Sequence, residues 1–527
     1  MPEPTAGSDI TVVFTEGSGF LGGRAVNKLL QREYLARTTV RPAGSRTTEV
    51  LRRLPAGLTV ALAGLVLICG FAPGASANEK GAAQRLQQLK DEPSKLRNFL
   101  FGMPKGTDLH THLSGSVYAE SIIKWGAEDG KCVDPVTYVS SFPPCAAGQV
   151  PLANALLDTT LFDNIVEAWS MRGFVPGEES GHDHFFATFD LFGGAFSGRT
   201  PFGLAEETNR AGSQNVQYTE PLITPQFGHT LQVANQVGYN PDLGELRESL
   251  LNAGLLDAIP AASAQASSAL SGQQAILGCE GDDPQPGCDV TVGFDVQVLR
   301  NQQPAVIFAQ LLFGFELMKA DPNWVGMNMV QPEDASLSIT YYRLHMRMIE
   351  FLKQLYPDEN VTLHAGELVP GLTPPEDLRF HIRQAVNVAG AQRIGHGADL
   401  KWEKNPQGLL DDIVGKKVCL EINLSSNAQI LGLEGKAHPI RDYVKNGVRV
   451  TLSTDDEGVS RTDLTNQYGI AVRQHNFGYR RLKAFAQEGL RCSFLPGSEK
   501  KVLMSKQKKL FTKFEAKFKP KVKKARK

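Results

Sequence analysis

From about residue 100 onward, the hydrophobic positions of the chain fall into two kinds of segment. Residues 303–320, 337–356 and 376–390 carry the longer mixed apolar and polar patterns that predict helices. The alternation of strand-like and helix-like segments extends over about 350 residues, which favours a parallel α/β fold, and a closed (β/α)₈ barrel accommodates that length as one domain. The short apolar runs that predict its buried strands are TDLHTHL, NVQYTEPLI, WVGMNMV, NVTLHAGEL, RIGHGA, VCLEINLSS and RVTLSTDD.

Two segments interrupt this alternation. Residues 130–150 and 255–295 are rich in Gly, Pro, Ser and Ala. We interpret them as loops or lids inserted into the barrel, because such compositions favour turns over regular elements. The sequence contains no internal repeat that would suggest a solenoid or propeller instead.

The N-terminal region carries a pattern typical of export. Arg52 and Arg53 precede LPAGLTVALAGLVLICGFAPGASA, an apolar run that ends in the small-x-small sequence of residues 75–77. This combination predicts a signal peptide over residues 51–77 with cleavage after Ala77, so the protein is expected to be secreted or periplasmic. A buried helix or an uncleaved membrane anchor is the alternative interpretation.

In residues 1–50, Gly17, Gly19 and Gly22 have the G-x-G-x-x-G spacing of a dinucleotide-binding turn. The segment resembles the start of an extended short-chain dehydrogenase or nucleotide-sugar epimerase. Glu16 stands where that resemblance expects a further glycine, and its carboxylate would repel a pyrophosphate. The segment also ends before a second half of such a domain can form. We therefore expect a truncated, non-functional Rossmann-like segment, or a start site set too far upstream.

The composition is that of a globular protein, with 42% hydrophobic and 21% charged residues. Four cysteines bracket short loops, which predicts the disulfides Cys132–Cys145 and Cys279–Cys288 and agrees with export. Cys419 lies in the apolar run VCLEINL and is expected to be a buried free thiol, whereas Cys492 has no assignment.

The barrel is expected to occupy residues 78–498 and to be followed by a Lys-rich tail, residues 499–527. Apolar residues stand among the lysines of this tail, which allows a basic amphipathic helix that touches a membrane surface or a polyanion. A solvated tail whose first turns pack on the barrel is the simpler alternative. The apolar positions are Leu503, Leu510, Phe511, Phe514 and Phe518.

Polar residues that suit chemistry fall at the ends of four predicted strands. Parallel strands of a barrel deliver their carboxyl ends, and the loops that follow them, to a single mouth. We therefore expect these side chains to meet. They are His110 and His112, His364 and Glu367, His396, and the pair Asp455 and Asp456.

Four of these residues suit a zinc ion. His110, His112, His364 and Asp455 would supply three imidazoles and one carboxylate, leaving a position open for water. Zinc lowers the pKa of such a water to about 7, which makes a nucleophile available at neutral pH. The sequence thus predicts one catalytic Zn²⁺ ion.

The motifs MPKGTDLHTH, LHAGE, IGHG and LSTDDEG, in this order, resemble those of the adenosine deaminase family over roughly residues 100–480. The MPKG lead-in is most similar to the secreted, growth-factor-related branch. The resemblance implies zinc-dependent hydrolytic deamination of adenosine or 2′-deoxyadenosine to inosine and ammonia. A zinc hydrolase acting on another aminated ring, and a secreted binding or signalling protein on a deaminase-like barrel, remain alternatives.

The resemblance also implies individual roles. Glu367 would protonate the purine ring nitrogen, His396 would orient the attacking water or act as a base, and Asp456 would accept a hydrogen bond from the purine edge at N7. Ser114 stands where the family has an Asp that reaches the ribose, and Gln331 where it has a Gly. These two changes affect sugar recognition. The expected substrate contacts are His112, Ser114, Gln331 and Asp456.

Other nucleotide-related functions are less well supported. The second zinc deaminase fold requires H-x-E with P-C-x-x-C, which the sequence lacks, and apart from the basic tail no feature suggests nucleic-acid binding. Seven further histidines have no comparable context and are expected to be structural or surface residues. They are His182, His184, His229, His345, His381, His438 and His475.

Overall fold

The computed structural model describes residues 10–11, 36–37 and 77–518, and the chain divides into two compact units, Met1–Gly74 and Ala75–Lys527. Of the first unit the structure describes only the short parallel pair β1 (Ile10–Thr11) and β2 (Ala36–Arg37). The other residues of the Rossmann-like segment, and the predicted signal peptide up to residue 76, lie outside the described residues. No helix in the described part of the chain is long and apolar enough to cross a membrane.

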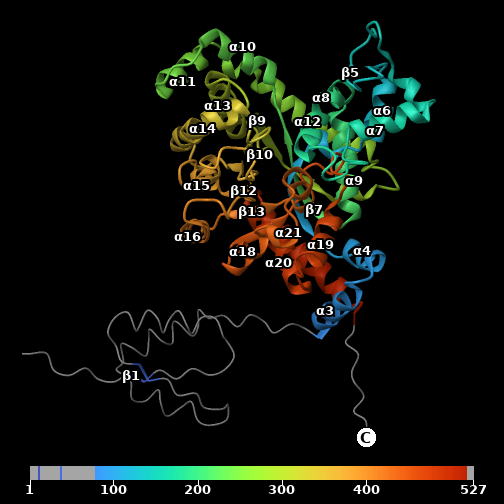
Figure 1. Ribbon diagram of the computed structural model, residues 1–527, viewed down its shortest axis with the longest axis vertical. Helices are drawn as coiled ribbons and strands as arrows, with labels where there is room; N and C mark the ends of the chain where they lie inside the picture. The colour runs from blue at the N-terminus through green and yellow to red at the C-terminus, as the bar shows by residue number, and fades with distance from the viewer. Residues whose placement is uncertain (1–9, 12–35, 38–76, 519–527) are drawn as a thin grey trace, which may run out of the picture. The chain divides into compact units, whose positions relative to one another are not determined.

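Eight parallel strands of the second unit form the predicted α/β barrel (Figure 1). They make two sheets, with the orders β10-β9-β7-β3 and β11-β12-β13-β14. Single parallel bridges, Met327 to Val361 and Thr111 to Asp455, join the edges of the sheets, so the strands follow one another around the ring although the ladders are not continuous. Their bounds are β3 Gly106–His112, β7 Val216–Ile223, β9 Phe294–Leu299, β10 Trp324–Val330, β11 Thr362–Ala365, β12 Arg393–His396, β13 Cys419–Ile422 and β14 Arg449–Leu452.

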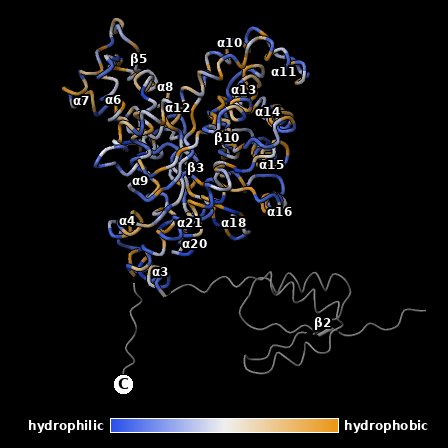
Figure 2. The backbone as a smooth tube through the Cα atoms, turned by 180° about the vertical axis from the view of Figure 1, so that it is seen from behind, coloured by the Kyte–Doolittle hydropathy of each residue, from blue (hydrophilic) through white to orange (hydrophobic). Residues whose placement is uncertain are grey.

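Helices surround the strands (Figure 1), and in Figure 2 their residues alternate between hydrophobic and hydrophilic along the chain, as expected of helices with one buried face. The predicted helices 303–320 and 337–356 are confirmed as α13 and α14. The α-helices are α3 Ala77–Leu89, α4 Pro93–Phe101, α5 Leu113–Ser116, α6 Ala119–Glu128, α7 Thr159–Ala168, α8 Gly181–Phe196, α9 Thr200–Ser213, α10 Phe227–Val237, α11 Leu243–Asn252, α12 Ile259–Ile276, α13 Pro304–Ala320, α14 Ser336–Leu355, α15 His381–Asn387, α16 Pro406–Lys416, α17 Leu424–Leu431, α18 Ile440–Lys445, α19 Leu464–Arg473, α20 Tyr479–Cys492 and α21 Gly497–Glu515. Short 3₁₀ turns cover Leu152–Leu156, Leu255–Ala258, Pro286–Asp289, Asp377–Arg379 and Gly435–Ala437.

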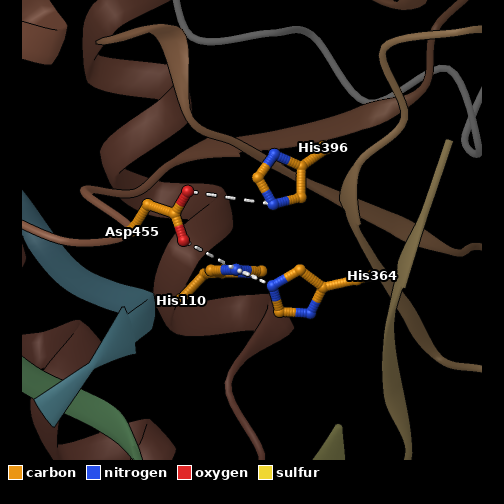
Figure 3. A group of neighbouring side chains, drawn as sticks. All are labelled: His110, His364, His396 and Asp455. Atoms are coloured by element: carbon orange, nitrogen blue, oxygen red, sulfur yellow. Dashed lines mark hydrogen bonds and ion pairs between the residues drawn. The ribbon is translucent and has the colours of Figure 1, made fainter. Parts of the chain in front are cut away.

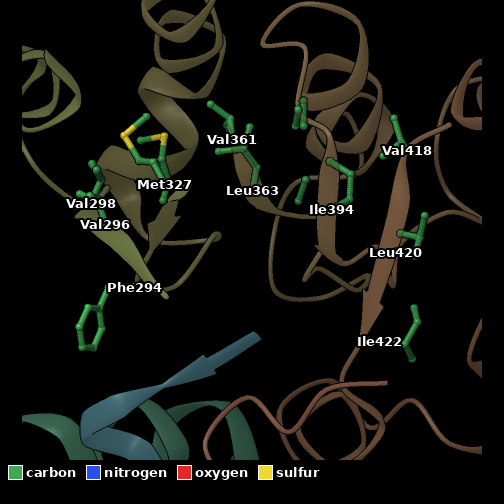
Figure 4. Close-up of a cluster of buried hydrophobic side chains, with 14 of the residues drawn as sticks. Phe294, Val296, Val298, Met327, Val361, Leu363, Ile394, Val418, Leu420 and Ile422 are labelled. Atoms are coloured by element: carbon green, nitrogen blue, oxygen red, sulfur yellow. The ribbon is translucent and has the colours of Figure 1, made fainter. Parts of the chain in front are cut away.

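The main core lies between the strands and the outer helices (Figure 4). Strand β9 shows why its sequence fits there: Phe294, Val296 and Val298 belong to this core, whereas Asp295 and Gln297 make polar contacts with Arg393 and His112 of other strands. Alternate residues of a strand point to opposite faces, so the polar residues of β9 face the barrel interior.

The expectation of a loop over 255–295 is wrong in its main part. Residues 259–276 form helix α12, and the chain then leads into β9, a strand absent from the predicted set. Ala is the best helix former, and Pro260 is tolerated because it lies in the first turn. The buried residues Ala262, Ala266 and Ala269 follow helical spacing and give α12 one packed face.

The other predicted insertion, residues 130–150, forms most of a small antiparallel sheet rather than a plain loop. Its strands are β4 (Cys132–Val133), β5 (Ser140–Ser141) and β6 (Val150–Pro151), in the order β5-β4-β6. The sheet packs with helices α6, α7 and α8 around a second apolar cluster that includes Ile165 and Trp169. A further two-residue strand, β8 (Thr291–Val292), pairs with β7.

Three disulfides lie in the described part of the chain. Cys132–Cys145 and Cys279–Cys288 are confirmed. The expectation that Cys419 is a free thiol is wrong, because its sulfur is bonded to that of Cys492, 73 residues away in the sequence. Cys419 begins β13 and Cys492 ends α20, so this bond ties a barrel strand to an outer helix.

Most of the described part of the Lys-rich tail belongs to helix α21. Its residues Phe511 and Phe514 are buried, and the Phe514 ring packs against Phe99 of α4 and Tyr479 of α20. These aromatic side chains are therefore covered by the compact unit. The contact of the lysines with a membrane surface or polyanion stays a prediction.

Candidate metal centre and active site

The predicted side chains meet at the carboxyl ends of the barrel strands. His110 and His112 come from β3, His364 from β11 and His396 from β12, while Asp455 follows β14. Figure 3 shows His110, His364, His396 and Asp455 pointing toward one another from separate elements. The strand-end argument from the sequence thus agrees with the arrangement in space.

The four expected ligands have the spacing of a metal site. Nε2 of His364 lies 3.1 Å from Nε2 of His110 and 3.2 Å from Nε2 of His112. Oδ1 of Asp455 lies 3.3 Å from Nε2 of His110 and 3.3 Å from Nε2 of His112. Ligand atoms about 2.0–2.1 Å from a tetrahedral zinc ion would be about 3.3–3.4 Å apart. His396 stands slightly farther away, with Nε2 3.9 Å from Oδ2 of Asp455.

The other ring nitrogen of each histidine ligand faces an acceptor. Nδ1 of His110 lies 2.8 Å from Oε2 of Glu421, Nδ1 of His112 lies 2.9 Å from Oε1 of Gln297, and Nδ1 of His364 lies 2.9 Å from Oδ1 of Asn328. Each Nδ1 therefore carries the proton, and each Nε2 directs a lone pair toward the common centre. Three lone pairs aimed at one point fit a cation, and this is the usual supporting arrangement of metal-binding histidines.

Glu421 is itself held by a buried charge network. Arg393 donates from Nε to Oε1 of Glu421 and also pairs with Glu220 at 2.5 Å and Asp295 at 3.3 Å. Burial would raise the pKa of Glu421, but Arg393 and then His110 outweigh it and hold the pKa below its usual range. Glu421 is thus an ionised acceptor that orients the His110 ring.

Backbone geometry explains how adjacent residues serve one site. Asp455 has a φ of 65°, outside the strand region, and His396 also has a φ of 65°. The N–H of Asp455 donates to the carbonyl of His110, and the N–H of His112 donates to the carbonyl of Asp455, both at 2.9 Å. This anchored turn at the end of β14 places Asp455 at the ligand cluster and Asp456 in the cavity wall.

Gly395 is required by the close approach of the His110 ring. A Cβ at position 395 would overlap Cε1 of His110 and lie 2.7 Å from its Nδ1. We expect Gly395→Ala to displace this ring and to weaken zinc affinity about 10–100-fold, the usual cost of disturbing a ligand's support. Metal titration of the purified variant measures this. Gly415→Ala is the matched control, since nothing lies within 4 Å of its added Cβ, and equal affinities of the two variants would contradict the expected crowding.

Glu367 follows a tight turn after β11. Gly366 has a φ of 76°, and the N–H groups of Gly366 and Glu367 donate to the carboxylate of Glu333 at 3.1 Å and 2.7 Å. His381 also binds Glu333, at 2.6 Å. Burial raises the pKa of Glu367 well above its usual range, and the nearby charges of Asp455 and Glu333 raise it further. The geometry therefore favours a protonated Glu367.

A cavity of about 520 Å³ opens beside this cluster. The predicted residues Ser114, Gln331, Glu367 and Asp456 all line it, as do His112, His364 and Asp455. The Gln331 side chain accepts a hydrogen bond from the N–H of Asn301 at 2.9 Å. His396 is fully buried beside the cluster, with Nδ1 3.5 Å from Oε1 of Glu367.

Helix α8 forms a cavity wall that sequence reasoning did not identify. His182, Phe185, Phe186 and Phe189 line the cavity, although His182 is expected from the sequence to be a structural or surface residue. Nε2 of His182 lies 2.9 Å from Oδ1 of Asp334, which joins α8 to the segment after β10. The aromatic run HFFATF is visible in the sequence, but only the fold shows that its phenylalanines line the cavity.

The support residues were also missed. Glu421, Gln297 and Asn328 lie 311, 185 and 36 residues from the histidines they contact. The alternating pattern of β13 and β9 hinted that Glu421 and Gln297 face inward, but nothing local pairs them with particular ligands. Glu457, the residue after Asp456, pairs with Arg210 at 2.5 Å.

A parallel barrel with histidine and aspartate donors converging at its strand ends is an arrangement typical of metal-dependent hydrolases. Residues 317–510 match the family model described as adenosine deaminase. Adenosine deaminases of Escherichia coli strains SE11 and SMS-3-5 are 31% identical to this chain over 148 and 150 residues. This part of the chain is therefore similar to adenosine deaminases. The matched stretches are 28% of this chain and 41% and 42% of the relatives, so the chain spans about four tenths of the length of the curated relatives it matches.

Solved structures agree on the fold. Arabidopsis ADAL complexed with IMP has a TM-score of 0.52 and 18% sequence identity, covering 79% of this chain and 99% of its own. Arabidopsis N6-mAMP deaminase MAPDA has a TM-score of 0.51 and 17% identity, covering 78% and 99%. At these identities the likeness concerns the barrel alone.

Proposed function

We propose that this protein is a zinc-dependent deaminase that converts adenosine or 2′-deoxyadenosine to inosine or deoxyinosine and ammonia, outside the cytoplasm. The observation that carries the proposal is the cavity itself: metal-type donors converge at its base, and the buried carboxyl of Glu367 stands beside them. A flat aminated base placed there meets both a metal site and a proton donor.

His110, His112, His364 and Asp455 would hold one zinc ion, since their donor atoms and second-nitrogen partners fit it. A zinc ion held by these residues would supply an activated water for attack at the carbon that bears the amine. The remaining chemistry belongs to side chains around the cavity.

Glu367 gives its proton to the ring nitrogen next to the attacked carbon, which its raised pKa permits at neutral pH. We infer for Asp456 the opposite role from the one expected from the sequence, because purine N7 can only accept a hydrogen bond. Burial raises the pKa of Asp456 to about 8, against the opposing effect of His112, and its Oδ1 is buried without a partner among the described residues. Purine N7 is an acceptor, so a protonated Asp456 donates to it.

The cavity favours a nucleoside over a nucleotide. The two Arabidopsis structures are described as an N6-mAMP deaminase and as a complex with IMP, so a 5′-phosphate has to be considered. None of the residues that line this cavity is Lys or Arg, whereas Asp183 and Asp190 are exposed lining residues of α8. A phosphate dianion would find no Lys or Arg here. His182, whose pKa is raised despite burial by its contacts with Asp334 and Asp183, is already paired with these two carboxylates, and the exposed Asp190 would repel the phosphate.

We expect kcat/KM for adenosine to exceed that for AMP by about 10²-fold or more, because each missing or repelled phosphate contact costs about 1–3 kcal/mol. The fall in ultraviolet absorbance on deamination measures the turnover of both substrates. The double variant Asp183→Asn/Asp190→Asn should raise kcat/KM for AMP and leave kcat/KM for adenosine nearly unchanged. Preference of the wild type for AMP would contradict the nucleoside assignment, and no turnover of any aminopurine would contradict the proposed function.

Export is supported by the three disulfides of the described chain, since such bonds persist in oxidising compartments. We expect the mature protein to begin at Asn78. N-terminal sequencing of the protein recovered from the medium or periplasm measures this, and recovery of an unprocessed chain in the cytoplasm would contradict it.

A further inference from the structure

A chain of buried polar groups reaches His396 from the side away from the metal donors. Asn427, on α17, contacts His396, and His438, just before α18, contacts Asn427. All three side chains are buried. The backbone N–H of Ile440 completes the chain at its far end, 3.1 Å from Nδ1 of His438.

The backbone N–H of Ile440 fixes the direction of every hydrogen bond in this chain of polar groups. An N–H can only donate, so Nδ1 of His438 accepts and its proton lies on Nε2. Burial lowers the pKa of His438 to about 3, and His475 lowers it further, so the ring is neutral and carries one proton. Nε2 of His438 then donates to Oδ1 of Asn427 at 2.9 Å, which leaves the Asn427 amide NH₂ to donate to Nδ1 of His396 at 2.8 Å.

Two competing contacts are longer. Oε1 of Glu367 lies 3.5 Å from Nδ1 of His396, and Nδ2 of Asn423 lies 3.5 Å from Nε2. Both distances stand at the limit for hydrogen bonds, whereas the Asn427 bond has ideal length. Oδ1 of Asn423 is buried with no partner among the described residues, so a half-turn of this amide would present an acceptor to Nε2.

We infer that Asn427 and His438 are positioning residues that fix His396 as the tautomer with its proton on Nε2. The inference rests on the proposed deaminase function for its catalytic meaning. In this tautomer Nε2–H is directed toward the metal donors, 3.9 Å from Oδ2 of Asp455. His396 then donates a hydrogen bond to the oxygen that adds to the base, and it cannot take a proton at Nε2. Of the two roles expected from the sequence, the structure thus favours orientation of the water over base catalysis.

The test is ¹⁵N nuclear magnetic resonance of histidine-labelled, zinc-loaded protein without substrate, with the His396 signals assigned by their loss in His396→Gln. Protonated and bare ring nitrogens have well-separated shifts. We expect a proton on Nε2 in the wild type. Asn427→Asp removes the amide donor and puts an acceptor in its place, so we expect the proton to move to Nδ1.

The kinetic counterpart is a fall in kcat of about 10–100-fold in Asn427→Asp with KM nearly unchanged. His438→Gln keeps a donor for Asn427 and should retain more activity than His438→Leu. His475→Phe is the matched control, because His475 is buried close to His438, with ring centroids 5.8 Å apart, but no hydrogen bond joins it to Asn427 among the described residues. It should leave the tautomer and kcat unchanged.

A wild-type His396 with its proton on Nδ1 would overturn the inference, and this spectrum needs no variant to fold. An unchanged tautomer in folded Asn427→Asp would overturn it as well. Because the spectrum requires no turnover, a protein that shows the expected tautomer but deaminates no aminopurine would contradict the proposed function and leave the positioning role intact.

Discussion

Replacement of Glu367 by glutamine is expected to lower kcat for adenosine by about 10²–10⁴-fold, the range that positioned acid catalysts contribute. The amide keeps the size and the hydrogen-bonding capacity of the side chain but cannot give a proton to the purine ring. The structure supports this role because the Glu367 carboxyl is buried, and because its main chain is held by Glu333 at 2.7 Å. Steady-state kinetics measures the loss, and the bound zinc should remain.

The pH dependence follows from the same group. A carboxyl with a raised pKa is protonated below that pKa and loses its proton as the pH rises through it, so the donor form disappears on the alkaline side. We expect kcat/KM of the wild type to fall there, at a pH above the usual range of a glutamate. Glu376→Gln is the matched control, since Glu376 is exposed on the loop after the Glu367 turn. Equal activity of the two variants would remove Glu367 from the mechanism.

Removal of the metal is the second change expected to have a large effect. A bound cation contributes several kcal/mol to such a reaction, which corresponds to on the order of 10³-fold in rate. We expect prolonged chelation to reduce turnover by at least that factor and added Zn²⁺ to restore it. Substitution of Asp455, the single carboxylate among the four donors, should reduce turnover by the same factor, and added Zn²⁺ should not restore it.

Mg²⁺ is the matched control ion. Three imidazole nitrogens suit zinc, whereas magnesium prefers oxygen ligands and retains its waters. Mg²⁺ should therefore leave the chelated protein inactive. Full activity of a protein shown by elemental analysis to contain no metal would contradict the assignment of the cluster as a metal centre.

The barrel and most of the candidate site could be predicted from the sequence because a simple rule connects them. Residues at the carboxyl ends of parallel strands share one mouth, so His110, His364, His396 and Asp455 could be brought together without knowledge of the contacts. The requirement that the chain turn between Asp455 and Asp456 also followed from strand geometry, and the φ of 65° at Asp455 satisfies it.

The parts that could not be predicted depend on pairings between distant residues. Strand β9 was missed because its first residues fall in the segment 255–295, which its composition assigned to an insertion. The partners of its inward residues Asp295 and Gln297, Arg393 and His112, are reached only across the barrel. Helix α12 was hidden because a face of small alanines resembles a flexible segment in composition. The bond from Cys419 to Cys492 spans 73 residues, and no local signal indicates it.

The pKa of Asp456 illustrates a further limit. The position of Asp456 beside Asp455 is visible in the sequence, but the burial that raises its pKa to about 8, and that supports the donor role proposed above, is not. Such a change depends on how completely the surrounding chain excludes water. A sequence motif can therefore name a residue and its place while leaving the direction of its hydrogen bond undetermined.

The central claim is that His110, His112, His364 and Asp455 hold a single zinc ion at the base of the cavity. Crystals of the protein grown with zinc, measured above and below the zinc absorption edge, test it most directly. The account predicts one anomalous peak per chain, about 2.0–2.2 Å from the three Nε2 atoms and from a carboxylate oxygen of Asp455. No peak at these four residues, or a peak bound elsewhere in the chain, would contradict it.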